Sequence, residues 1–520
     1  MEAIQKYAPF FVSALLMGVL LHFIYPHYQY YIDPDGTAYL TISQRYANGD
    51  YLKAINGYWS PWSCWLTAML IKTGIAAIPA SVIINTTGAI GFLYISQSFF
   101  RHFGIVQRLQ WLLCITLAFF LCFAVFWQSF DDLWECFFLL SALRLMLFGG
   151  FKNKPVFWVI YGMIGALAYF AKAYSFPFFI LSTLCCTWFI SKGSQVQWLK
   201  ISLVSIGVMI LCSLPWIIAL HHKYDIWTTS TAGALNTSWY LIGHPYWKNG
   251  IDLLIPPTYA NSPYYWEDPY FANGITPHFW NSFSLFGLQI LRIGYNAWKL
   301  LKSMLQLSVL FPLVFIDLAS VFVPALQRSK KIEKDSSHDL FIVGISFFLF
   351  LSGYLLVNFE SRYIWYLLPL GMVVGGLAIQ NVKGDFPGNF LIVILPLTFL
   401  IYPANCMKTM YDQGANEYKI ATQLKQLNIQ GTFTGSAKPG IEIQRMERLA
   451  YFSGNQFYSH TKQEASHQDL LQEMRRYHVN YYFALKSSTD SNFVDEQGNP
   501  FPEITNGGIN GLKVYVVNVP

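Results

Sequence analysis

The stretch Asp33-Pro34-Asp35-Gly36-Thr37-Ala38-Tyr39 places two carboxylates shortly after the first long apolar run of the chain, which extends from Ala8 to Tyr25. A charged side chain at the boundary of a bilayer is costly unless it faces water, so these residues indicate an aqueous cavity at one membrane face. A carboxylate in such a cavity can accept the proton of an attacking hydroxyl group. The same residues also suit a simple Asx turn, with Pro34 and Gly36 as the turn residues.

Further ionisable side chains lie at the ends of later apolar runs. They are Asp131, Asp132, Glu135, Lys172, Glu360 and Arg362. Glu135 follows Asp131 by about one helical turn, so both are expected to face the same cavity. Lys172 and Arg362 have an alternative interpretation, because basic residues at helix ends often only extend toward the membrane interface. An enzyme that moves a sugar from a lipid phosphate needs this mixture, since carboxylates accept a proton and cations offset charge on a departing phosphate.

The composition indicates an integral membrane protein. Hydrophobic residues make up 54% of the 520 residues and charged residues only 12%, against ~25% charged residues in soluble domains. Apolar runs of ~20 residues recur, which is the length of a membrane-spanning helix. The chain has a net charge of +6, and its basic residues lie in short clusters between these runs. This placement indicates on which side of the membrane the connectors lie, and it does not indicate a nucleic-acid partner. The first apolar run is expected to be a membrane helix that is not removed as a signal peptide.

The runs predict an all-α polytopic membrane bundle of about 11 transmembrane helices, with further helices at the interface. The predicted spans are 8–26, 80–99, 109–127, 132–149, 156–172, 174–191, 201–221, 304–326, 339–358, 362–382 and 388–406. The run 61–78 is interrupted by Lys72 and Gly74 and closed by Pro79. This pattern predicts a helix that lies at the membrane interface.

The basic residues predict the orientation. A cytoplasmic N-terminus puts every basic connector on the cytoplasmic side, as the positive-inside rule requires. These connectors contain Arg101, His102, Arg108, Lys152, Lys154, Lys192, Lys200, Arg328, Lys330, Lys331, Lys334 and Lys383. The other face then receives a first outer loop at 27–60, with the acidic stretch, and a long loop at 222–303 that is rich in Trp, Tyr and Pro. The end of the long loop, Phe286 to Leu305, is typical of an interfacial helix.

The composition changes after Met407, which divides a membrane domain, 1–407, from a C-terminal segment, 408–520. Helical spacing covers 417–427 and 469–477, and strand patterns cover 431–435, 480–485 and 512–519. This predicts a small soluble α/β domain outside the cytoplasm. It has no Gly-rich phosphate loop and no clustered His, so catalysis is expected elsewhere. The eight scattered cysteines predict neither a disulfide framework nor a metal site.

Several short motifs resemble those of type C glycosyltransferases, and the resemblance extends over most of the membrane portion. The first outer loop carries Asp-Pro-Asp-Gly-x-x-Tyr-Leu from Asp33, then Tyr46-Ala47-x-Gly49-Asp50 and Asn56-Gly57-Tyr58-Trp59-Ser60-Pro61. Phe130-Asp131-Asp132 is similar to the family's second acidic loop. Ala171-Lys172 and Glu360-Ser361-Arg362-Tyr363, with Pro369, are similar to its later basic positions. The branch with the greatest similarity contains protein O-mannosyltransferases and bacterial aminoarabinose transferases.

Two positions depart from the pattern of that branch. The family often has Asp-Glu where this chain has Asp35-Gly36. Aminoarabinose transferases also place a Lys before a Pro-Pro pair, where this chain has Ser60-Pro61. The second departure weakens an assignment to lipid A and leaves the acceptor open.

The resemblance implies a helical bundle with a large outer cavity, a polyprenyl-phosphate-linked hexose or pentose as donor, and direct displacement with inversion. Asp35 matches the family's catalytic base, and Asp33, Asp131 and Asp132 are expected to shape or assist the acidic centre. The expected substrate-binding residues are Lys172 and Arg362, which hold the lipid phosphate, together with Glu360, Tyr363 and Glu135. No metal ligand is assigned, and a divalent cation is an optional cofactor. The expected partners are the donor, membrane lipids and an unidentified glycan, lipid or protein acceptor at the outer face of a bacterial-type inner membrane.

Two other functions fit part of the pattern. A transporter or flippase also carries ionisable residues in its membrane portion. Transporters, however, tend to show internal repeats with broken helices at the midplane, and the sequence shows no repeat. An envelope assembly protein whose outer domain binds a partner is the third alternative.

Overall fold

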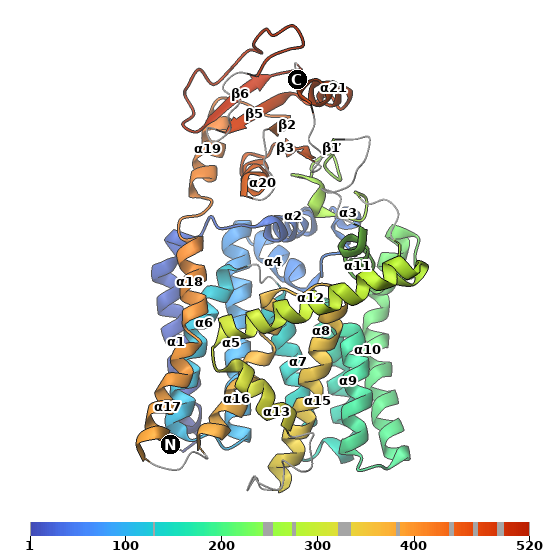
Figure 1. Cartoon of the computed structure of the whole chain (residues 1–520), viewed down its shortest axis with the longest axis vertical. Helices are drawn as coiled ribbons and strands as arrows, with labels where there is room; N and C mark the ends of the chain where they lie inside the picture. Colours follow the sequence, from blue (N-terminus) through green and yellow to red (C-terminus); the bar gives the residue numbers. More distant parts are fainter. Residues whose placement is uncertain are drawn as a thin grey trace.

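The computed structural model describes residues 2–127, 131–242, 253–272, 277–320, 334–380, 385–435, 441–460, 466–485 and 493–518. It consists of a tall helical bundle with a smaller α/β part on one end (Figure 1). The N-terminus lies at the opposite end of the bundle from the C-terminus.

The first half of the bundle is built from long apolar helices. These are α1 (Glu2–Tyr28), α5 (Ala77–His102), α6 (Gln107–Phe126), α7 (Asp132–Met146), α8 (Pro155–Ala171), α9 (Ser175–Ile190) and α10 (Gln195–Tyr224). The second half contains α13 (Phe311–Ser320), α15 (Lys334–Leu356), α16 (Leu367–Gln380), α17 (Asp385–Thr398) and α18 (Ile401–Met410). Among the described residues, six segments are long and apolar enough to cross a membrane: 6–28, 77–102, 107–126, 195–224, 338–356 and the segment that begins at Phe390. α8, α9 and α16 are apolar but shorter.

The predicted multi-helix membrane bundle is confirmed by this arrangement, while the number of crossings remains a prediction. The helices at the periphery expose large apolar side chains, including Leu15 (70% exposed), Phe23 (71%) and Leu211 (69%). Such side chains are stable on a surface that lipid covers, because lipid tails impose no hydration cost. α6, in contrast, is largely buried inside the bundle.

Several helices lie across one end of the bundle and do not run along it. They are α2 (Pro34–Asn48), α3 (Tyr51–Ala54), α4 (Trp62–Lys72), α11 (Ala232–Ile242) and α12 (Phe283–Leu307). α12 crosses the bundle diagonally in Figure 1. Two of its polar residues, Gln289 and Asn296, face inward and donate to backbone carbonyls at the end of α15. Its apolar residues, such as Leu291 (71% exposed), face outward, as expected of an interfacial helix.

Three predicted boundaries are wrong. The span predicted at 304–326 begins too early, because residues 304–307 complete α12, and Pro312 lies in the first turn of α13; residues 321–326 lie outside the described residues. The interfacial helix predicted at 61–78 ends at Lys72, before Gly74 with its positive φ of 94°. Pro79 lies near the start of α5, where a missing N–H costs no helical hydrogen bond. The run 388–406 is divided between α17 and α18.

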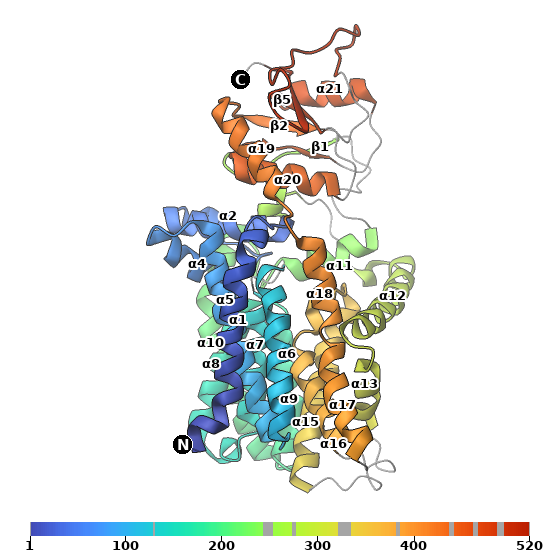
Figure 2. The ribbon, with the colours of Figure 1, turned by 90° about the vertical axis from the view of Figure 1, so that its left-hand side faces the viewer.

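The α/β part follows α18 through α19 (Ala415–Gln426), as Figure 2 shows. Its sheet has the order β3-β2-β5-β6, with β3 (Gln456–Phe457), β2 (Thr432–Gly435), β5 (Tyr481–Leu485) and β6 (Leu512–Val516). β2 is parallel to β3 and β5, and β5 is antiparallel to β6. The helices α20 (Ile441–Ser453) and α21 (His467–Arg476) complete this part. The three predicted strand positions and both predicted helices match elements found here, whereas α20 and β3 were not predicted.

The long outer loop joins the two parts. Its strand β1 (Leu254–Ile255) pairs antiparallel with β4 (Ser459–His460) of the C-terminal part. This pairing places the segment 253–272 between the bundle and the sheet, close to the N-terminal end of α2.

Candidate active site

The acidic stretch forms the start of a helix, where the alternative interpretation was an Asx turn. Asp33 is the N-cap of α2, and its Oδ1 accepts a hydrogen bond from the Gly36 backbone N–H at 2.6 Å. Pro34 occupies the first helical position, where its fixed φ is favourable. Asp35 therefore lies in the first turn of α2, where the helix dipole stabilises a negative charge.

Arg362 is the centre of a buried charged cluster. Its Nη2 lies 2.9 Å from Asp35 Oδ2, and its Nε lies 2.9 Å from Glu360 Oε2 and 3.6 Å from Asp132 Oδ2. Arg362 belongs to the short 3-10 helix η5 (Ser361–Ile364), whereas Asp132 begins α7. Residues far apart in the sequence thus meet at one end of the bundle.

Lys172 completes the cluster from the end of α8. It forms an ion pair with Asp132, and its Nζ lies 4.4 Å from the centroid of the Tyr363 ring. The Tyr363 ring also stacks on Tyr354 of α15, with centroids 4.2 Å apart. The structure therefore brings together six of the predicted residues: Asp35, Asp132, Lys172, Glu360, Arg362 and Tyr363.

The other three predicted residues are held elsewhere. Asp131 Oδ1 accepts hydrogen bonds from the backbone N–H and the hydroxyl of Ser63 in α4, at 3.0 and 2.5 Å. Glu135 Oε1 accepts one from Ser175 of α9 at 2.9 Å. Asp131 and Glu135 thus bond to different helices, and the expectation that they face one cavity remains a prediction. Glu135 nevertheless lies close enough to Lys172 and Arg362 to interact with their charges.

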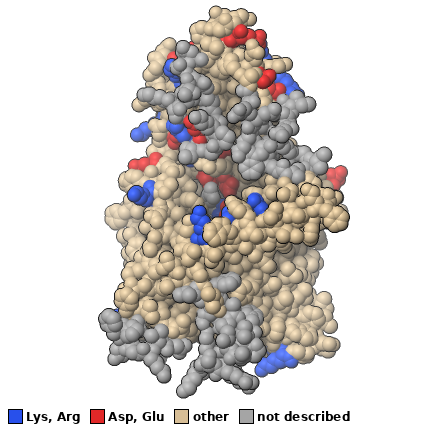
Figure 3. All heavy atoms as spheres, viewed as in Figure 1, with Lys and Arg blue, Asp and Glu red and all other residues tan. Residues whose placement is uncertain are grey.

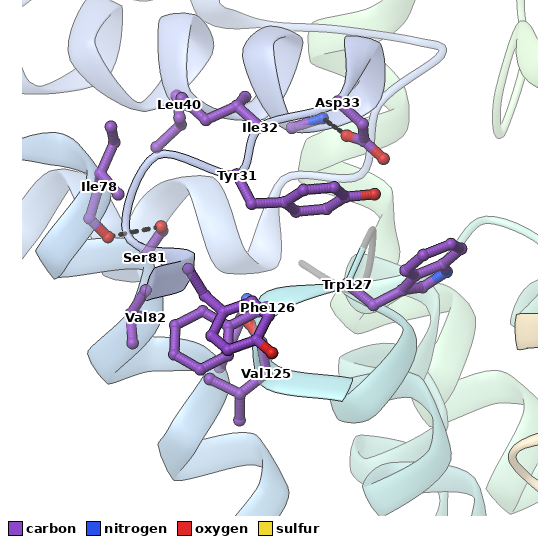
Figure 4. Close-up of a pocket in the computed structure, with 13 residues that line it drawn as sticks. Tyr31, Ile32, Asp33, Leu40, Ile78, Ser81, Val82, Val125, Phe126 and Trp127 are labelled. Carbon is purple, nitrogen blue, oxygen red and sulfur yellow. Dashed lines mark hydrogen bonds between the residues drawn. The ribbon is translucent and has the colours of Figure 1, made fainter. Parts of the chain in front are cut away.

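Asp33 lies beside the cluster but outside it. Burial, together with the nearby charge of Asp35, raises the pKa of the Asp33 carboxyl to about 8. Its side chain extends next to the Tyr31 ring above a small cavity whose wall also includes Phe126 and Trp127 (Figure 4). The volume of this cavity is about 30 Å³, on a measure in which one water molecule needs about 10–15 Å³. Asp33 thus caps α2 next to a space too small for a sugar.

The face of the molecule in Figure 3 has a hollow between the bundle and the C-terminal part. Figure 3 shows acidic side chains in this hollow, with basic side chains along the adjacent edge of α12. The exposed fraction of the side chain rises from 11% for Arg362 through 18% for Asp35 to 35% for Glu360. Within the cluster, Glu360 is therefore the most accessible of these three side chains to solvent and Arg362 the least.

The long outer loop contributes contacts to the site that were not predicted. The Trp266 indole N–H donates to Asp35 Oδ1 at 3.1 Å, and the Tyr264 hydroxyl donates to the Pro34 carbonyl oxygen at 2.7 Å. The aromatic richness of this loop was visible in the sequence. Nothing in the spacing of these residues, however, connects them to a motif more than 200 positions earlier.

The charged cluster does not suit a divalent cation in this arrangement. Each of its carboxylates is paired with Arg362, and Asp132 is also paired with Lys172. Over the described ranges, no group of three or more His, Cys, Asp or Glu side chains is placed to hold a metal ion.

Solved structures of two membrane glycosyltransferases are similar to this chain. ArnT from Cupriavidus metallidurans bound to undecaprenyl phosphate has a TM-score of 0.54 and 11% sequence identity, over 100% of both chains. The Archaeoglobus fulgidus oligosaccharyltransferase in complex with Zn and sulfate has a TM-score of 0.56 and 13% identity, over 92% of this chain and 68% of that one. No protein-family model matches the sequence, and no curated protein matches it significantly. The similarity confirms the predicted resemblance to type C glycosyltransferases at the level of the fold.

Proposed function

We propose that this chain, which has the fold of type C glycosyltransferases, transfers a sugar from a polyprenyl-phosphate-linked donor to an acceptor of the cell envelope. The observation that carries the proposal is the cluster in which Arg362 pairs with Asp35 while Lys172 pairs with Asp132. It combines a carboxylate able to accept a proton with two cations able to hold a phosphate, and these side chains are partly accessible to solvent.

The reaction would be a single displacement. The donor phosphate binds Arg362 and Lys172, and Asp35 is then released from its ion pair with Arg362. The acceptor hydroxyl oxygen attacks the anomeric carbon and transfers its proton to Asp35. The bond between the anomeric carbon and the phosphate oxygen breaks, and its electron pair leaves with the polyprenyl phosphate. One displacement inverts the anomeric centre.

The remaining residues have supporting roles in this proposal. Asp132 orients Lys172, while Tyr363 lines the space beside both cations, with its ring near Lys172 Nζ. Glu360 lies where the site is most exposed and would contact the acceptor or the sugar. Asp33 fixes the start of α2, and Asp131 and Glu135 anchor the start of α7 through Ser63 and Ser175.

The site is proposed to lie at the outer face of a bacterial-type inner membrane. The N-terminus would be cytoplasmic and the C-terminal domain extracytoplasmic, because the basic connectors gather at one end of the bundle. The described connectors with Arg101, Lys152 and Lys192 follow α5, α7 and α9, all of which run the same way. The connectors with Arg328, Lys330, Lys331 and Lys383 lie outside the described residues.

A donor assay tests the proposal. Purified full-length protein is incubated with undecaprenyl-phosphate-linked glucose, mannose or aminoarabinose, and with a crude envelope fraction as acceptor. We expect release of undecaprenyl phosphate and labelling of the acceptor fraction with at least one donor. A protein that moves these lipids across a vesicle membrane and leaves the sugar–phosphate bond intact would instead be a flippase.

A further inference from the structure

The segment 253–272 of the long outer loop holds the first turn of α2 from above. Trp266 donates its indole N–H to Asp35 Oδ1, and Tyr264 donates its hydroxyl to the Pro34 carbonyl oxygen. Two residues of one segment, two positions apart, thus contact the start of α2: Trp266 binds the side chain of Asp35, and Tyr264 binds the backbone next to it. The other carboxylate oxygen of Asp35, Oδ2, faces Arg362.

Buried ion pairs fix this segment to the bundle. Glu267, only 1% exposed, pairs with Arg45 of α2, with Arg45 Nη2 3.1 Å from Glu267 Oε2. Asp268, fully buried, pairs with Lys223 at the end of α10, with 2.8 Å between the charged atoms. Breaking either pair would leave an uncompensated buried charge. The two residues after Trp266 are therefore held firmly in place.

The C-terminal part also contacts this segment, through β4 and through β3 of its four-stranded sheet. β1 pairs with β4, and the Phe457 backbone N–H donates to the Pro263 carbonyl oxygen at 2.7 Å. The Gln456 side-chain amide donates to the carbonyl oxygens of Tyr259 and Ser262, each at 3.2 Å. The sheet thus contacts the backbone of the segment just before Tyr264.

We propose that Trp266 is a positioning residue for Asp35, and that the C-terminal domain supports the segment so that Trp266 keeps this contact. The inference rests on the proposed role of Asp35 as the base. When Arg362 turns to the donor phosphate, Asp35 Oδ2 becomes available to the acceptor hydroxyl. The Trp266 N–H on Oδ1 then holds the carboxylate in orientation. A base must keep its geometry within a narrow range to act.

The substitution Trp266→Phe tests the contact, because it removes the N–H and keeps an aromatic ring. Loss of a hydrogen bond to a charged group corresponds to a fall in rate of about 10- to 150-fold. We expect this fall in kcat. The KM for the undecaprenyl-phosphate sugar should stay within about twofold, since Arg362 and Lys172 are untouched. In an Asp35→Asn background, under single-turnover conditions, Trp266→Phe should slow the residual reaction no further.

The outcomes separate the two proposals. Normal turnover by Asp35→Asn would refute the proposed base. A slow Asp35→Asn enzyme together with a normal Trp266→Phe enzyme would refute only the positioning role. The positioning role would also be refuted if Trp266→Phe lowered the rate equally in the unchanged protein and in the Asp35→Asn background. A change in KM without a change in kcat would refute it as well.

A pair of glutamine variants tests whether the C-terminal domain holds the segment 253–272 in place. This test remains valid even if Trp266→Phe does not fold. Gln456→Ala removes two hydrogen bonds to the segment, whereas Gln472→Ala changes an exposed residue of α21 in the same domain. We expect Gln456→Ala to lower kcat by about 2- to 12-fold, the effect of about one neutral hydrogen bond. Gln472→Ala should behave as the unchanged protein. Equal kcat values for the two variants would refute this part of the inference.

Discussion

Arg362 Nη2 and Asp35 Oδ2 lie 2.9 Å apart, so the proposed phosphate ligand and the proposed base are each other's partner in this structure. In the proposed mechanism, each side chain exchanges this partner for a substrate group. A donor phosphate that attracts Arg362 would release Asp35 in the same step. The arrangement therefore links the availability of the base to the presence of the donor.

Asp35→Asn should abolish most turnover. The amide keeps the size of the carboxylate but cannot accept a proton, and general-base catalysis contributes about 10²- to 10⁴-fold. Release of undecaprenyl phosphate measures the effect, and binding of the donor should persist. Asp33→Asn is the matched control, because Asn also caps a helix well and should leave most activity. If Asp35→Asn turned over normally while Asp33→Asn or Asp132→Asn was inactive, Asp35 would not be the base. That role would then pass to Asp33 or Asp132.

Arg362→Ala and Lys172→Ala should weaken use of the donor. Each change removes a charge-assisted contact with the phosphate, which corresponds to about 10- to 150-fold. The dependence of the rate on donor concentration measures this effect, with Lys302→Ala on the exposed side of α12 as the control. An unchanged concentration dependence in both variants would mean that these two residues only extend toward the interface.

Thermal stability in detergent should depend on pH through Asp33. Because burial raises the pKa of Asp33 from 3.8 to about 8, the folded protein keeps a proton that the unfolded chain loses above about pH 4. Stability should therefore fall as pH rises toward about 8 and change no further above it. The Tm of the unchanged protein should drop more between about pH 6 and pH 9 than that of Asp33→Asn. A parallel decline of both proteins would contradict this prediction.

Reporter fusions test the orientation. Alkaline phosphatase fused after Met407 should be active, because the C-terminal segment is proposed to lie outside the cytoplasm. A fusion after Lys334, in a basic connector, should be inactive. The opposite result would place the charged cluster in the cytoplasm and contradict the proposed function.

The sequence predicted the bundle because apolar runs of membrane length are a strong signal in one chain. It also predicted the five charged residues of the cluster, because charged side chains at the ends of apolar runs are costly unless they have a function. Tyr363 was predicted only from the resemblance to type C glycosyltransferases. The predicted interfacial helix from Phe286 to Leu305 matches α12 closely. The start of the span after it was misplaced, because apolar residues at the end of α12 are followed by Val309 and Leu310 with only Ser308 between them. The contact between Trp266 and Asp35 could not be predicted, because it depends on how β1 and β4 pair across more than 200 residues.

The charged cluster contains three carboxylates, Asp35, Asp132 and Glu360, and two cations, Arg362 and Lys172. On the proposed mechanism, the donor phosphate carries one negative charge, and the product phosphate about two at neutral pH. The proton taken up by Asp35 offsets the additional charge, so total charge in the site is unchanged at the moment of transfer. Once Asp35 gives this proton to water, its carboxylate again attracts Arg362 and competes for it with the product phosphate. Deprotonation of the base would thus expel the spent lipid phosphate and restore the pair with Arg362 for the next donor.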